Sequence, residues 1–375
     1  MNSAKLGRNE KCWCGSGKKY KKCHLGRENE EADNIWDSVG QLTKAFSQKE
    51  CMSPDCLKID CEGAIISAHT VPRGSSLKKI ATNSHVLGLK PDMADLQKTN
   101  GKIRFKKLGV RQASTFNGFC AKHDREFFSC VENEDFVARP DQCLAVCFRA
   151  VSRELYAKRA SSVVDDILVG ADKGKSQEEQ IMMNMLRRNF GAGTQSAIRE
   201  LEHAHKLIGD AFATGQTHKV RSYVLLFAET LPMMFSGGFS PSKDITGVQL
   251  QDLSNLDKDA EQLFLSAFGT ESGSAMVCSW IERKYAIGKT IAEQVCELPV
   301  DQQANWIAET AFLRMENIFL SPRWYSAIDD KVKKRIDRLV MSGVNPFNII
   351  DHLMEPLPNG ETDFGFPKVE STFFV

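Results

Sequence analysis

The chain has 375 residues, a net charge of +1, 42% hydrophobic residues and 26% charged residues. This composition is ordinary for a soluble globular protein of two or three domains, and it excludes a global polyanion-binding signature. No apolar run reaches the roughly 18 residues of a membrane span, and the first residues lack the apolar segment of a signal peptide. We therefore expect a cytoplasmic protein, in which twelve cysteines favour metal binding over disulfides.

The N-terminal segment holds four potential metal ligands in the stretch KCWCGSGKKYKKCHL. They follow the spacing C-x-C-x8-C-H and are Cys12, Cys14, Cys23 and His24. Three thiolates and an imidazole make a closed tetrahedral zinc set, and the Gly-Ser-Gly turn between them lets the backbone fold back on the metal. Few residues here can form a core, so the metal must supply most of the folding energy.

Basic residues surround these ligands. Residues 1–27 carry eight Lys and Arg against one Glu, a net charge of +7, and the acidic run ENEEAD follows at once. The positive charge should help hold the thiolates deprotonated. A short basic module followed by an acidic hinge indicates a tethered binding element for a protein or nucleic-acid partner.

Residues 7–26, GRNEKCWCGSGKKYKKCHLG, closely resemble the SEC-C motif, the zinc-binding tail best known at the C-terminus of the SecA preprotein translocase ATPase. All four ligand positions match, and Trp13 stands where that family often has proline. The resemblance implies a zinc ion and a docking role for residues 1–27, and it says nothing about the rest of the chain.

Residues 51–135 predict a second zinc module, because two short-spaced ligand pairs lie far apart in the chain. This is the layout of a treble-clef or zinc-ribbon site. The preferred set is Cys51, Cys56, Cys120 and His123. Cys61 is an alternative to Cys51, since it has the same spacing from Cys56. The other interpretation is a set of unrelated free thiols, with His123 and the next residue at a helix cap.

The order of pieces in this region also resembles the His-Asn-His (HNH) nuclease family: a cysteine pair, H-x-x-P, an Asn/His element, then C-x-x-(C/H). The resemblance implies that His69 is the general base, that Asn83 orients it and that His85 is a ligand of a divalent catalytic metal. Ala68 departs from the family, which has an acidic residue or histidine there. An alternative role for His69 is that of a zinc ligand or of a buried histidine bonded to a backbone carbonyl.

The remaining segments predict ordinary structural elements. They are a linker helix in 28–50, a basic hairpin or edge strand in 101–115, a helical hairpin in 140–215 broken at Gly191 and Gly193, a small mixed sheet unit in 219–281, C-terminal helices in 284–355 and a weakly ordered tail in 356–375. Within the sheet unit we expect strands at 220–228, 245–253 and 274–281 and a helix at 257–268.

Taken together, the sequence predicts an α+β fold: an N-terminal zinc knuckle, a treble-clef or HNH-like zinc module, and a mainly helical body with a small β-sheet. The predicted function is recognition, in which two structural zinc ions shape modules that dock to a protein or nucleic-acid partner. The alternative is a metal-dependent HNH-type nuclease acting on DNA or RNA, for which phage defence is one setting. The helices also offer a surface for oligomerisation.

Overall fold

The computed structural model describes residues 6–90, 98–99, 101–343 and 357–375. The helices of the described part are α1 (Ile35–Ala45), α2 (Lys78–Ile80), α4 (Ala121–Glu132), α5 (Pro140–Ser161), α6 (Val163–Gly170), α7 (Gln177–Thr214), α8 (Ile287–Glu297), α9 (Val300–Arg314), α10 (Pro322–Ala327) and α11 (Asp330–Gly343). The strands are β1 (Ile65–His69), β2 (His85–Leu89), β3 (Phe105–Gly109), β4 (Thr115–Cys120), β5 (Val220–Phe227), β6 (Met233–Phe239), β7 (Leu263–Gly269), β8 (Ser274–Ile281), β9 (Ile318–Leu320) and β10 (Val369–Phe374).

The fold is a mixture of helices and antiparallel strands, which confirms the predicted α+β class. The chain divides into two compact units. The stem unit comprises Met1–Gln48 and Ala157–Ile198, and the sheet unit comprises Lys49–Tyr156 and Arg199–Val375. Each described helix is too short or too polar to cross a bilayer.

The stem unit combines the N-terminal knuckle with α1, α6 and the first part of α7. Asn34 caps α1 by accepting a hydrogen bond from the Trp36 backbone N–H at 3.0 Å, as expected of a helix N-cap. An ion pair between Lys173 and Asp33 (2.6 Å) ties the start of α1 to the connection between α6 and α7. Within the segment 28–50, where a linker helix is predicted, residues 35–45 form α1, which packs against α6.

Helix α7 is continuous, so the break predicted at Gly191 and Gly193 is absent. A Cβ atom at Gly191 would lie 2.8 Å from the Asp165 carboxylate on α6. Glycine at this position therefore permits close packing of α6 on α7 and does not end the helix. The start of α7 carries a capping box, in which Glu179 accepts from the Ser176 backbone N–H at 2.9 Å.

The sheet unit is built on an eight-stranded antiparallel sheet with the order β10-β5-β8-β7-β6-β9-β2-β3. Its strands come from segments that are far apart in the sequence, including β2 and β3 at one edge and the C-terminal β10 at the other. The sheet is thus larger than the unit predicted for 219–281. The basic segment 101–115 does supply an edge strand, as predicted.

Predictions for three further segments differ from the structure. We expect a helix at 257–268, but residues 263–269 form β7, which is buried along its whole length between β6 and β8. Residues 245–253, expected to be a strand, lie in the connection between β6 and β7, where the Asp244 carboxylate accepts from the backbone N–H groups of Thr246 and Val248. The tail, expected to be weakly ordered, ends in β10, which pairs with β5.

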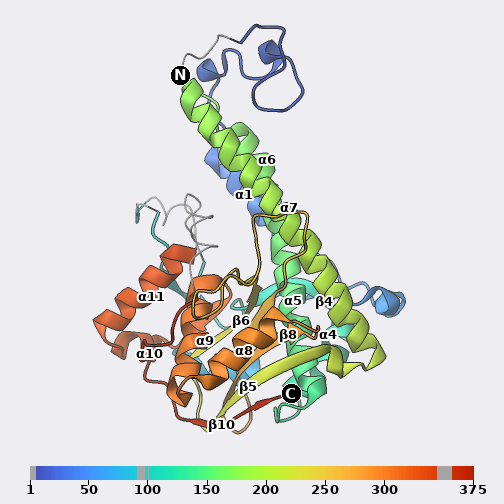
Figure 1. Cartoon of the computed structure of the whole chain (residues 1–375), viewed down its shortest axis with the longest axis vertical. Coiled ribbons are helices and arrows are strands. Elements are labelled where there is room, and N and C mark those ends of the chain that lie inside the picture. The colour runs from blue at the N-terminus through green and yellow to red at the C-terminus, as the bar shows by residue number, and fades with distance from the viewer. Residues whose placement is uncertain (1–5, 91–97, 100, 344–356) are drawn as a thin grey trace. The chain divides into compact units, whose positions relative to one another are not determined.

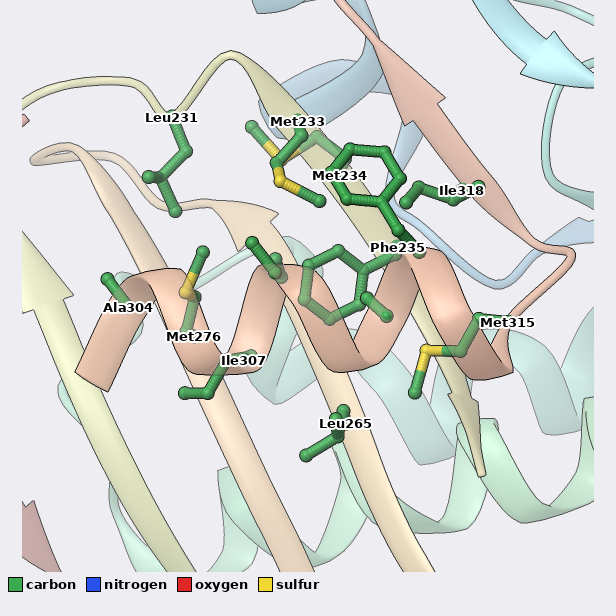
Figure 2. Close-up of a cluster of buried hydrophobic side chains, with 14 of the residues drawn as sticks. Leu231, Met233, Met234, Phe235, Leu265, Met276, Ala304, Ile307, Met315 and Ile318 are labelled. Carbon is green, nitrogen blue, oxygen red and sulfur yellow. The ribbon is translucent and has the colours of Figure 1, made fainter. Parts of the chain in front are cut away.

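Helices cover both faces of the sheet. On one face, α9 packs against β6 and α8 packs against β8 (Figure 1). Figure 2 shows the core on this face, where Ala304 and Ile307 of α9 lie over side chains such as Met276 and Leu265 of the strands. On the other face, Ala145 and Arg149 of α5 approach Ser236 of β6. The sheet is therefore buried on both sides, which explains its near-continuous apolar strands.

The C-terminal helices predicted in 284–355 are present as α8, α9, α10 and α11. The sequence predicts the second of them over 301–320, but the chain leaves this helix after Arg314 and enters β9. Residues 344–355 of this prediction lie outside the described part of the chain.

Candidate metal centres

The four ligands predicted near the N-terminus converge on one point. The Sγ atoms of the three cysteines and a ring nitrogen of His24 all lie within 4.8 Å of one another. His24 Nδ1 is 3.2 Å from both Cys12 Sγ and Cys23 Sγ, and Cys14 Sγ is 3.4 Å from Cys23 Sγ. Neighbouring ligand atoms of a tetrahedral Zn²⁺ with this S₃N set are roughly 3.5–3.8 Å apart. The residues present therefore fit a structural zinc ion.

The local backbone explains how these ligands meet. The Cys12 N–H donates to the Lys18 carbonyl at 2.8 Å, which closes a loop around the first two cysteines. Gly15 and Gly17 have positive φ angles of 75° and 72°, which a glycine adopts without strain. The backbone N–H groups of Cys23 and His24 both donate to the Tyr20 carbonyl, so a single helical turn presents the second pair.

Burial and hydrogen bonding shift the pKa values of two thiols at this first centre. Burial raises the pKa of Cys12 to about 12. Burial also acts to raise the pKa of Cys14, but hydrogen bonds from Ser16 bring it below its usual value. Outside the ligand shell, six basic side chains are exposed; these are Arg8, Lys11, Lys18, Lys19, Lys21 and Lys22.

A second group of ligand atoms, also within 4.8 Å of one another, lies in the sheet unit and consists of Cys51, Cys61, Cys120 and His123. His123 Nδ1 is 3.3 Å from Cys51 Sγ and 3.4 Å from Cys120 Sγ. The set again offers three thiolates and one imidazole in a closed arrangement, which suits a structural zinc ion. The chain thus brings together two Cys/His clusters that can hold metal ions.

The fourth ligand of this second centre differs from the predicted one. Cys56, which we preferred from its spacing, is exposed and is not among the converging atoms, whereas Cys61 is. The reason is the short 3-10 helix Asp55–Asp60, which carries Cys56 on the surface and returns the chain to the cluster at Cys61. The sequence suggested Cys61 as a substitute for Cys51, but the structure places it where Cys56 was expected.

The second centre is held by β4, α4 and α7. Cys120 is the N-cap residue of α4, and its Sγ accepts from the His123 backbone N–H at 3.5 Å. The His123 ring stacks on Phe127 with a centroid distance of 5.1 Å. His205 of α7 bonds the Met52 carbonyl through its Nε2 at 2.9 Å, next to the ligand Cys51. These contacts help to position the ligand segments.

The three residues proposed to be catalytic lie in different surroundings. His69 is the last residue of β1. Burial lowers the pKa of its ring, and a hydrogen bond to the Val110 backbone partly opposes that shift. Its Nε2 is buried and has no hydrogen-bond partner in the described part. Asn83 has a φ of 51° in a tight turn, and its carbonyl lies 2.6 Å from Nδ1 of the exposed His85. His85 therefore contacts the backbone of its own turn and strand pair, including Thr82 and Gly109. The surroundings of His69 resemble the buried-histidine alternative.

Comparison with known proteins identifies the first centre. Residues 8–26 are a SEC-C motif. Protein translocase subunit SecA from Chloroflexus aurantiacus is 38% identical over 82 residues, which are 20% of this chain and 8% of that protein. SecA from Chloroflexus aggregans is 40% identical over 72 residues (19% and 7%), and SecA from Pseudomonas putida is 78% identical over 23 residues (6% and 2%).

The similarity to SecA is local. The chain spans less than a tenth of the length of these relatives, so it shares a module with them. No solved structure matches the chain. The SEC-C motif contains the four ligands of the first centre, while the second centre lies outside the matched residues.

Proposed function

We propose that the chain is a zinc-binding, cytoplasmic recognition protein whose SEC-C motif docks onto an acidic partner protein or a nucleic acid. The observation that carries this proposal is the set of six exposed basic side chains in residues 8–24, the segment that also holds the first ligand cluster. A metal-organised loop holds these charges in fixed positions, so less entropy is lost when a polyanionic surface binds. All twelve cysteines lie in the described part of the chain as free thiols, in keeping with a reducing compartment.

Replacing Lys18, Lys19, Lys21 and Lys22 together by alanine should weaken binding of the intact protein to a polyanion by at least about tenfold. The probes are a fluorescein-labelled single-stranded RNA and a labelled polyglutamate peptide, titrated at several salt concentrations. For RNA, the binding constant K falls as salt rises. Loss of four phosphate contacts should make the negative slope of log K against log salt shallower by up to about 3. The RNA and the peptide also distinguish a nucleic-acid partner from an acidic protein.

The matched control removes the same charge from the sheet unit, by alanine at the exposed positions Lys258, Lys284, Lys331 and Lys334. It should bind both probes as the unmodified protein does. A variant with serine at Cys12 and Cys23 should lose about one zinc ion together with the binding. Equal affinities for both lysine variants, or undiminished binding by a metal-free preparation, would reject the docking role.

A second candidate function is a metal-dependent nuclease of the HNH type. It is favoured by the order of elements around His69: β1 ends at this residue and pairs with β4, which leads at once into α4. Burial lowers the pKa of His69, so its ring is neutral near pH 7, as a general base must be. Nε2 is sealed from solvent, however, so water could reach it only after a local opening.

The direct test is cleavage of plasmid DNA and of RNA in the presence of Mg²⁺, Mn²⁺ or Ni²⁺. If His69 is the base, His69→Ala should lower the cleavage rate by at least about 100-fold, within the range typical of general-base catalysis. His218→Ala is a control, because this histidine lies in the short 3-10 helix before β5. Full cleavage by the His69 variant, or none by the unmodified protein with any of the metals, would exclude this function.

A further inference from the structure

The metal ligand His24 has a second contact, made by the ring nitrogen that faces away from the cysteines. Its Nε2 lies 2.9 Å from Oδ2 of Asp172, in the connection between α6 and α7. Both side chains are buried, with 8% and 6% of their surface exposed. Because Nδ1 faces the thiolates, an ion bound there leaves the ring proton on Nε2, where it can be donated to the carboxylate.

Asp172 is held on its other oxygen as well. Arg27, the first residue after the SEC-C motif, donates from Nε to Asp172 Oδ1 at 2.7 Å. The same guanidinium donates to the Val169 carbonyl at the end of α6. The carboxylate is therefore fixed between a metal ligand and a cation, which prevents it from rotating away from the imidazole.

A third contact joins the ligand loop to α7 in the same unit. Asn184, which is 9% exposed, points its Nδ2 at the Cys14 carbonyl, 3.4 Å away. One turn further along α7, Arg188 lies so close to Gly15 that a Cβ there would be 3.3 Å from its Nη1. Two of the four ligand positions, Cys14 and His24, are thus attached to the α6–α7 segment.

We propose that Asp172 is a positioning residue of the first metal centre. It fixes the orientation of His24 and increases the basicity of the ligating nitrogen, as carboxylates hydrogen-bonded to metal-bound histidines do. By the same contact it couples the metal ion to the helices, so that the ion, the SEC-C motif and the first part of α7 are ordered together. This inference rests on the metal occupancy proposed above, and it is independent of which partner docks.

The test compares Asp172→Asn, which keeps the shape but loses the charge, with Asp166→Asn at an exposed position of α6. In the full chain, Asp172→Asn should bind zinc 10- to 100-fold more weakly at one of the two centres, measured by competition with a chromophoric chelator. With saturating zinc and ¹⁵N-labelled histidine, the Nε2 resonance of His24 should shift, and amide exchange should accelerate in residues 177–190. Asp166→Asn should change none of these quantities.

The outcomes separate this inference from the docking function. If the unmodified protein binds no zinc at Cys12, Cys14, Cys23 and His24, the metal proposal itself fails. If it binds zinc and Asp172→Asn retains the affinity and the His24 resonance, the role of Asp172 is rejected and docking stands. If the stem unit of Asp172→Asn unfolds, Asp172→Glu is measured in its place. Zinc affinity equal to that of the unmodified protein supports positioning by a carboxylate. Weak zinc affinity in a folded Asp172→Glu protein rejects it.

Discussion

Replacing Cys61 by serine should reduce the zinc content from about two ions to about one per chain and destabilise the sheet unit by more than about 4 kcal/mol. Cys61 belongs to the converging ligands of the second centre, with Cys51, Cys120 and His123. These ligands come from two separate segments, and a bound ion would tie the 51–61 loop to the junction of β4 and α4. Loss of one thiolate leaves an open site of much lower affinity, so the folding free energy supplied by the ion is lost.

The matched control is Cys56→Ser, a change of the same kind in the same loop. Cys56 is exposed and its thiol is not among the converging atoms, so this variant should keep both ions and its unfolding midpoint. Metal content is measured by inductively coupled plasma mass spectrometry and stability by urea denaturation. The reverse pattern, with one ion lost from the Cys56 variant and both kept by the Cys61 variant, would show that the predicted spacing was correct and this arrangement of ligands is not.

The two centres show what sequence spacing can and cannot determine. The first could be predicted completely, because its ligands lie within one short segment whose glycines dictate the turn. The second depends on the path of a loop with three cysteines, and only the 3-10 helix Asp55–Asp60 decides which thiol faces inward. Asp172 is 148 positions from His24, and no pattern in the sequence relates a lone aspartate to a distant ligand.

Secondary structure could be predicted where the sequence shows a strong apolar periodicity. The sequence pattern was misleading where a segment is completely buried. The residues of α1 show one clear apolar face, and their helix was correctly located. In β7 every side chain is buried, so the segment carries no alternation of polar and apolar residues to indicate a strand. Gly191 indicated a helix end by its propensity, but tertiary packing against Asp165 decided its role.

The C-terminal tail shows how contacts between distant residues order a segment, and one of its anchors is a buried carboxylate. Glu309 of α9 is fully buried and accepts from Arg335 Nε at 3.0 Å, from the Gly360 backbone N–H at 3.0 Å and from the Thr362 hydroxyl. Two of these three donors belong to the tail that continues into β10. One anchor of the tail therefore lies about fifty positions earlier in the chain.

Replacing Glu309 by alanine should destabilise the sheet unit by about 3 kcal/mol, because it leaves buried donors unsatisfied and Arg335 without its counterion. We expect the larger consequence to be structural. Once its anchor is lost, β10 can detach from β5 and leave a long, apolar strand edge open to pairing with other chains. The variant should therefore unfold at lower urea concentration, lose the tail to limited proteolysis and form larger species in size-exclusion chromatography.

Glu316→Ala is the control, since Glu316 is an exposed glutamate just after α9 and its removal should leave stability and proteolysis unchanged. Glu309→Gln separates charge from shape: it keeps one acceptor oxygen and should lose part of the stability, with the tail still protected. A Glu309→Ala protein with an unaltered urea midpoint and a protected tail would show that pairing of β10 with β5 orders the C-terminus without the carboxylate. The hydrogen bonds to Glu309 would then form because the tail is already folded, and they would not be what orders it.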